Sequence, residues 1–198
     1  MEVTAALVKE LRDRTGIGMM ECKSALQETN GNIDEAITVL RKKGFARAKD
    51  KMTREAKDGL VGSYIHLEGK IGVLVEMNCE SDFVARNDEF KSLLKNVCLH
   101  IAAFSPQYVS SKEIPQDVLD QEKEIIRDQF KGSNKPPEII EKIVEGKLNK
   151  FFEEVCLMDQ AFVKDDKTTV GKIVASYIAK FGENIQINRF ARFEIGKS

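Results

Sequence analysis

GKIGVLVEMNCESDFVARNDEF, residues 69–90, places a strand, a polar corner and the start of a helix in one short stretch. Apolar and other residues alternate in its first half, which predicts a strand with one wholly apolar face: Ile71, Val73, Val75 and Met77. Its end opens an amphipathic helix whose apolar stripe runs from Phe90 to Ala102. Residues 81–84 between them, called the corner below, are polar at Ser81 and Asp82 but include a phenylalanine, Phe83. The stretch therefore indicates the fold and raises the question of what the Phe83 ring contacts.

The remaining core segments predict a small antiparallel sheet with helices segregated around it. A strand precedes the turn at Glu68 and Gly69, and a third strand closes the chain with one expected apolar face: Ile185, Ile187, Ala191, Phe193 and Ile195. Helices are expected from Pro115 and from Pro136, around the apolar run at residues 148–156, and at residues 170–178. Strands and helices do not alternate, so the predicted class is α+β rather than a doubly wound sheet.

The first 44 residues predict three short helices that precede the core. Thr4 and Asn32 stand where the first and third helices need N-terminal caps, and Glu35 follows Asn32 at capping-box spacing. Gly44 is expected to end the third helix. The charged segment 45–58 is then predicted to be a connector that is helical or partly extended. We therefore predict a three-helix domain with connector at residues 1–52 and an α+β core domain at residues 53–198.

Composition narrows the possible classes of protein. The chain has 198 residues, 42% of them hydrophobic, with 31 basic and 32 acidic residues and a net charge of -1. This balance predicts no general attraction to nucleic acid or to anionic membranes, and the basic residues 41–43 are expected to be a solvated helix face. No apolar run approaches the ~20 residues of a membrane helix, and no secretory signal is recognisable. The expected location is the cytoplasm.

Motifs for cofactors and catalysis are missing from the sequence. It contains neither G-x-x-x-x-G-K-[ST] nor G-x-G-x-x-G, so we expect no bound nucleotide or other cofactor. The two histidines and four cysteines show no metal-ligand spacing, and the cysteines are expected to be reduced core thiols: Cys22, Cys79, Cys98 and Cys156. We expect no enzymatic activity, although a histidine paired in space with Cys79 or Cys98 leaves a cysteine-dependent enzyme open.

Two surfaces remain that a protein partner would recognise. Phe83 lies seven residues before Phe90, so its ring either extends the helix stripe into the core or points outward from the corner. Ser81 and Asp82 favour a sharp turn and a helix cap, which would hold an outward ring stiffly. Met19 and Met20 follow a glycine corner, and adjacent helical residues cannot both point inward. Either one of the two methionines is exposed and binds a partner, or Met20 packs into the core of its own domain and Met19 has no binding role.

Long segments carry a resemblance to a known family. LVKELRDRTGIGMMECKSALQETNGNIDEAITVLRKKG resembles the opening of the elongation factor Ts family, and GKIGVLVEMNCESDFVARNDEF resembles its central signature. IVEGKLNKFFEEVCLMDQAFVKD and NRFARFEIG are similar to its closing segments, so the likeness covers nearly the whole chain. This chain departs from the family pattern at Ser81, where threonine is usual, and at Ile17, where alanine is usual.

The resemblance implies a guanine-nucleotide exchange factor that binds elongation factor Tu, both GDP-bound and nucleotide-free, during translation. It implies that the corner dislodges Mg²⁺ from elongation factor Tu, and the matching positions are Ser81, Asp82, Phe83 and Val84. It implies that a ubiquitin-associated-like three-helix domain docks on the nucleotide domain of elongation factor Tu, and the matching positions are Arg12, Met19 and Met20. No catalytic or metal-binding residue is carried over.

Resemblance to the shorter members of the family also implies a homodimer, because GKIGVLVE occurs once rather than twice. The expected contact is the open sheet face from Ile71 to Met77. The alternative to an exchange factor is a ubiquitin-associated-like adaptor whose core binds another protein or peptide without a wedge.

Overall fold

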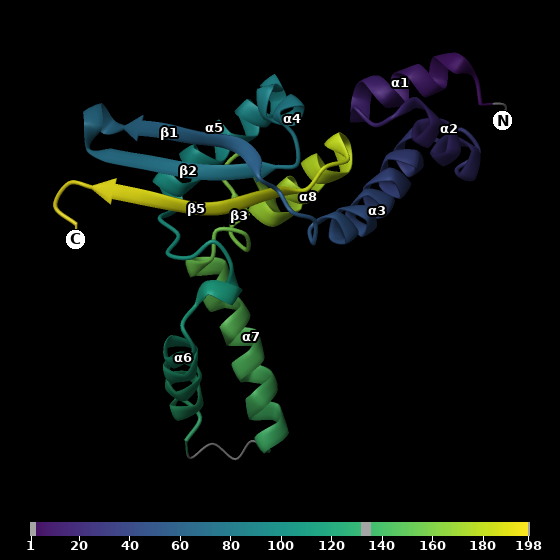
Figure 1. Cartoon of the computed structure of the whole chain (residues 1–198). Coiled ribbons are helices and arrows are strands. Elements are labelled where there is room, and N and C mark those ends of the chain that lie inside the picture. Colours follow the sequence, from purple (N-terminus) through teal and green to yellow (C-terminus); the bar gives the residue numbers. More distant parts are fainter. Residues whose placement is uncertain (1–2, 132–135, 198) are drawn as a thin grey trace. The chain divides into compact units, whose positions relative to one another are not determined.

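The computed structural model describes residues 3–131 and 136–197, which form an α+β fold (Figure 1). Three helices come first: α1 (Ala5–Thr15), α2 (Met19–Glu28) and α3 (Ile33–Lys51). One sheet has the strand order β1-β2-β5, formed by β1 (Asp58–His66), β2 (Ile71–Cys79) and β5 (Ile185–Glu194). The remaining α-helices of the described residues are α4 (Asp82–Arg86), α5 (Asp88–Phe104), α6 (Gln116–Asp128), α7 (Pro137–Val155) and α8 (Val170–Phe181). The predicted fold class and three-stranded antiparallel sheet are confirmed.

The chain forms two compact units that each draw on several segments. One comprises Met1–Gly59, Asn78–Phe90 and Val174–Gln186, and the other comprises Leu60–Met77, Lys91–Ile173 and Ile187–Ser198. The domain boundary predicted after residue 52 stays a prediction. Among the described residues, no helix combines the length and the apolar character that crossing a membrane requires.

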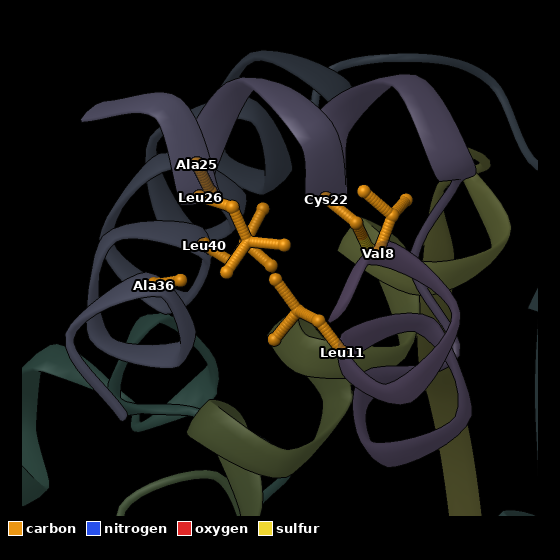
Figure 2. Close-up of a cluster of buried hydrophobic side chains, with 7 residues drawn as sticks. All are labelled: Val8, Leu11, Cys22, Ala25, Leu26, Ala36 and Leu40. Carbon is orange, nitrogen blue, oxygen red and sulfur yellow. The ribbon is translucent and has the colours of Figure 1, made fainter. Parts of the chain in front are cut away.

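The three N-terminal helices share a hydrophobic cluster, shown in Figure 2. Its buried members are Val8, Leu11, Cys22, Ala25, Leu26, Ala36 and Leu40. Both predicted caps are present, because Thr4 Oγ1 accepts the Leu7 N–H at 3.3 Å and Asn32 Oδ1 accepts the Asp34 and Glu35 N–H groups. The predicted starts of the first and third helices are therefore confirmed.

The third helix does not end at Gly44, where the sequence pattern predicted its end. It continues for another two turns, to Lys51. A glycine inside a helix costs only about 1 kcal/mol relative to alanine. The residues that follow, Phe45–Lys51, are rich in alanine, arginine and lysine, which favour helix and outweigh that cost.

The sheet buries the face that was expected to be its contact with a second copy. Val73, Val75 and Met77 are each at most 1% exposed. In the same unit, Leu94 of α5 lies so close to β1 that a Cβ added at Gly62 would be 2.5 Å from Leu94 Cγ. Because the chain's own helix covers this face, the prediction that residues 71–77 present it to a partner is wrong.

The predicted face of the last strand is also wrong, because β5 changes its alternation midway. Ile185 and Ile187 are buried, whereas Phe193 and Ile195 are exposed. The change falls at the adjacent residues Asn188 and Arg189, which are both exposed and both bond to the carboxylate of Glu76, at 2.9 and 2.7 Å. Two consecutive side chains on one face shift the pattern by one residue, as in a β-bulge.

Between β2 and β5, the chain departs from the sequence prediction in two places. The helix expected from Pro136 and the apolar run at 148–156 belong to one helix, α7, and Cys156 lies just past its end. Helices α6 and α7 pair as a hairpin (Figure 1), joined by Arg127 and Glu141 at 2.9 Å. The sequence pattern did not predict the small sheet of β3 (Ala161–Phe162) and β4 (Asp165–Thr169), because strands this short show little periodicity.

The N-terminal cluster yields a stability prediction. Replacing Leu26 by alanine leaves a cavity in a fully buried site, so the free energy of unfolding should fall by about 2–5 kcal/mol. Urea unfolding followed by circular dichroism measures it. The matched control Ile125→Ala removes a side chain that is 56% exposed, and its effect should stay within about 0.5 kcal/mol. Equal losses in both variants would contradict the assignment of this core.

Candidate partner-binding site

The corner after β2 places an aromatic ring in solvent. Helix α4 spans only Asp82–Arg86, and within it Phe83 is 84% exposed while its neighbour Val84 is 8% exposed. Ser81 and Asp82 are half-buried. Of the two positions that the sequence left open for Phe83, the structure has the outward one.

The ring points outward because α4 does not continue into α5. Asn87 separates the two helices with an extended backbone, φ -66° and ψ 136°. Its side chain then starts the next helix, because Asn87 Oδ1 accepts the Glu89 N–H at 2.8 Å. This break puts Phe83 out of phase with the apolar stripe, whereas Phe90 is fully buried.

Ser81 is fastened to the segment before β5. Its hydroxyl donates to Glu183 Oε1 at 2.6 Å, and its backbone N–H donates to Glu183 Oε2 at 3.0 Å. Ser81 occupies the N-terminal cap position of α4, but its side chain makes no capping bond to the helix. The expectation that Ser81 caps the helix is wrong, because its hydroxyl is committed to a carboxylate instead.

The carboxylate of Glu80 makes a bond in the opposite direction, to the segment that carries Glu183. Glu80 Oε1 accepts the backbone N–H of Asn184 at 2.7 Å, and Glu80 Oε2 lies 3.6 Å from Arg54 Nη1. Asn184 is completely buried, and its side chain donates to the Arg54 carbonyl at 2.6 Å. Sequence reasoning missed Glu80, Glu183 and Asn184. Their pairing depends on which strands lie side by side, and no periodic pattern reports that.

The three predicted N-terminal residues lie on α1 and α2, and all three are exposed. Met19 is 53% and Met20 78% exposed, so the alternative in which Met20 packs is wrong. Among the described residues, no hydrogen bond or ion pair joins Arg12, Met19 or Met20 to the corner. The partner-binding roles of these residues and of the corner stay predictions.

The cysteines and the buried histidine have structural surroundings. All four cysteines are free and buried. Burial raises the pKa of the Cys79, Cys98 and Cys156 thiols to about 11, with the Glu183 carboxylate adding to the rise at Cys79. Thiols of such high pKa hold almost no nucleophilic thiolate at neutral pH, so they lend the cysteine-dependent alternative no support.

His100 is fully buried in α5, where its ring bonds two groups of its own unit. Its Nδ1 accepts the Val163 N–H at 3.1 Å, so the Nε2–H donates to Gln160 Oε1 at 2.9 Å. Burial lowers its pKa, which favours this neutral form. In the described residues, no three His, Cys, Asp or Glu side chains are grouped so as to hold a metal ion.

Comparison with known proteins agrees with the resemblance over the full chain. The family model described as Elongation factor TS matches residues 2–197. Elongation factor Ts of Thermodesulfovibrio yellowstonii is 54% identical over 198 residues, which cover 100% of this chain and 98% of that protein. The Fervidobacterium nodosum protein of the same name is 54% identical with 100% of both chains covered, and that of Geobacter sulfurreducens is 55% identical with 100% and 91% covered.

Two phenylalanines seven residues apart give a matched stability test. Phe90→Ala empties a fully buried site and should lower the free energy of unfolding by about 3–5 kcal/mol. Phe83→Ala removes a solvated ring and should change it by less than about 0.5 kcal/mol. Urea titration of both variants measures the difference. A large loss in Phe83→Ala would mean that the ring packs within its own chain.

Proposed function

This chain belongs to the elongation factor Ts family of translation elongation factors, and we propose that it is the guanine-nucleotide exchange factor of elongation factor Tu. In this proposal it binds elongation factor Tu·GDP, promotes GDP release and leaves a nucleotide-free complex that GTP reloads. It acts by binding alone, in the cytoplasm, without a cofactor or a covalent step of its own. The observation that carries the proposal is the exposed Phe83 ring at the corner.

The corner acts as a wedge against the metal site of the partner. Mg²⁺ requires near-ideal octahedral geometry, so a small displacement of its ligands weakens its binding. The ion also neutralises phosphate charge, so its loss weakens the binding of GDP. Exchange is then a coupling free energy, because the factor that loosens GDP is itself loosened by nucleotide. This reciprocity lets GTP binding release the factor again.

One aromatic ring supplies only part of this effect. Burying a phenylalanine side chain contributes about 2–3 kcal/mol. At about 1.4 kcal/mol per factor of ten, that is roughly two decades of affinity. We therefore assign a share of the docking energy to the exposed N-terminal residues Arg12, Met19 and Met20. Methionine side chains suit such a surface because they are flexible and polarisable.

We also propose that the protein is a homodimer through the open face of the sheet. This face carries exposed apolar side chains from all three strands, Val61, Ile65, Leu74 and Phe193, and Ile195 follows directly after β5. Exposed apolar patches on a soluble domain mark interaction sites, and a flat sheet face pairs readily with a copy of itself about a twofold axis. The face opposite to the one expected from the sequence is thus the proposed contact.

The exchange proposal predicts a catalytic effect on elongation factor Tu loaded with fluorescent GDP. Substoichiometric protein should accelerate release, and Phe83→Ala should slow it by at least about tenfold because the ring contributes about 2–3 kcal/mol. Stopped-flow fluorescence measures both rates. A stable complex without accelerated release would favour the adaptor alternative. If the protein does not bind elongation factor Tu at all, the exchange proposal is wrong and elongation factor Tu is not the partner of an adaptor either.

The dimer proposal predicts a change of mass in one variant. Leu74→Asp places a charge on β2, the central strand of the open face, so the variant should run as a folded monomer in light scattering while the parent chain runs as a dimer. Burying an unpaired carboxylate costs several kcal/mol, which is enough to separate the copies. The control Ile125→Asp alters an exposed residue of α6 and should stay dimeric. A parent chain that is monomeric at every concentration would overturn the proposal.

A further inference from the structure

We propose that a clamp of four residues positions Phe83 for nucleotide exchange. Two of them follow the end of β2 and two precede the start of β5: Glu80, Ser81, Glu183 and Asn184. The proposal rests on the proposed function for its consequence but not for its geometry. Glu183 is the central positioning residue, because both of its carboxylate oxygens bond to Ser81. It does not touch the partner in this account and acts through the corner.

The clamp is reciprocal. The carboxylate of Glu183 accepts the backbone N–H of Ser81, the residue after Glu80, at 3.0 Å. The carboxylate of Glu80 accepts the backbone N–H of Asn184, the residue after Glu183, at 2.7 Å. Each glutamate thus fastens the backbone that carries the other. The Ser81 hydroxyl adds a third bond at 2.6 Å, which any residue without a hydroxyl at this position would lose.

The clamp lies where the sheet can no longer hold the corner by itself. Strand β2 ends at Cys79 and its neighbour β5 begins at Ile185, so residues 80–81 and 183–184 lie just beyond the last paired residues. The backbone N–H groups of Ser81 and Asn184 bond there to the carboxylates of Glu183 and Glu80, rather than to a backbone carbonyl of a neighbouring strand. Bonds from N–H or O–H to a carboxylate are shorter and about twice as strong as neutral ones, which makes them suited to fixing a backbone.

Two more contacts tie the clamp to the segment after α3. The side chain of Asn184, which has no exposed surface, donates to the Arg54 carbonyl at 2.6 Å. Glu80 also faces Arg54, at 3.6 Å. The orientation of the corner is therefore set by three segments of the chain that are distant in sequence.

A wedge requires this stiffness. A ligand shifts an equilibrium only by the difference in its affinity for the two states. If the corner were flexible, the ring would bind the Mg²⁺-bound partner without displacing any metal ligand. A ring on a rigid corner fits only the state of the partner in which the metal ligands have moved apart. Loosening the corner should therefore lower the maximal release rate more than it lowers the affinity of docking.

The test is the rate of GDP release from elongation factor Tu against the concentration of Glu183→Ala. Glu183→Ala removes both hydrogen bonds to Ser81, so the maximal rate should fall by at least about tenfold, with the half-saturating concentration nearly unchanged. A variant that is merely less folded would show the opposite, a higher half-saturating concentration with an unchanged maximal rate. That result, or no change at all, would overturn the proposal.

Two variants keep the result interpretable. Glu183→Gln retains an acceptor for the Ser81 N–H and gains a donor toward the hydroxyl, so it should recover the maximal rate to within about threefold. Glu145→Ala removes an exposed glutamate of α7 and should match the parent chain. If Glu183→Gln is as slow as Glu183→Ala although both are folded by circular dichroism, the hydrogen-bond geometry is not the cause and the proposal is wrong.

A measurement on the free protein separates this proposal from the proposed function. The chain contains no tryptophan, so Phe83→Trp introduces a single fluorescent reporter at the wedge. Time-resolved anisotropy should show restricted motion of that ring, and adding Glu183→Ala should increase its fast motion. Unchanged motion would refute the clamp even if exchange is observed. A failure of exchange in the parent chain, with the motion increased as expected, would refute the proposed function alone.

Discussion

The two carboxylates at the end of the sheet are the constraint on which the candidate site depends. Glu80 and Glu183 each accept a backbone N–H from the segment that carries the other, and the short helix α4 starts directly from this crossing. In that helix Val84 is buried while Phe83 is in solvent, and the clamp holds the backbone that carries both. An exposed aromatic ring on fixed backbone loses little entropy on docking, which is the property a wedge requires.

Periodicity predicted much of the fold because the helices and strands bury one face each. The caps Thr4 and Asn32, the alternation of β2 and the apolar stripe from Phe90 to Ala102 all appear in the structure as the residues indicated. The predicted helix end failed where a single residue typical of helix ends is followed by residues that favour helix. Gly44 marks a helix end only if the following residues do not favour helix, and here they do.

The sequence predicted where the chain turns between β2 and α5, but it did not predict the geometry of that turn. Spacing alone places Phe83 in line with Phe90, and only the extended backbone at Asn87 breaks that line. The pairing of Glu183 with Ser81 spans 102 residues, so it becomes visible only when β2 and β5 are known to be neighbours. The same holds for β5, whose exposed Phe193 and Ile195 follow from a slip in alternation at Asn188 and Arg189.

A crystal structure of this chain bound to nucleotide-free elongation factor Tu tests the central claim most directly. The account predicts that the Phe83 ring is buried against the nucleotide domain of the partner, beside the position of its Mg²⁺, and that the bonds between Glu183 and Ser81 are retained. A complex in which this ring remains in solvent, or turns back into its own chain, would contradict the account.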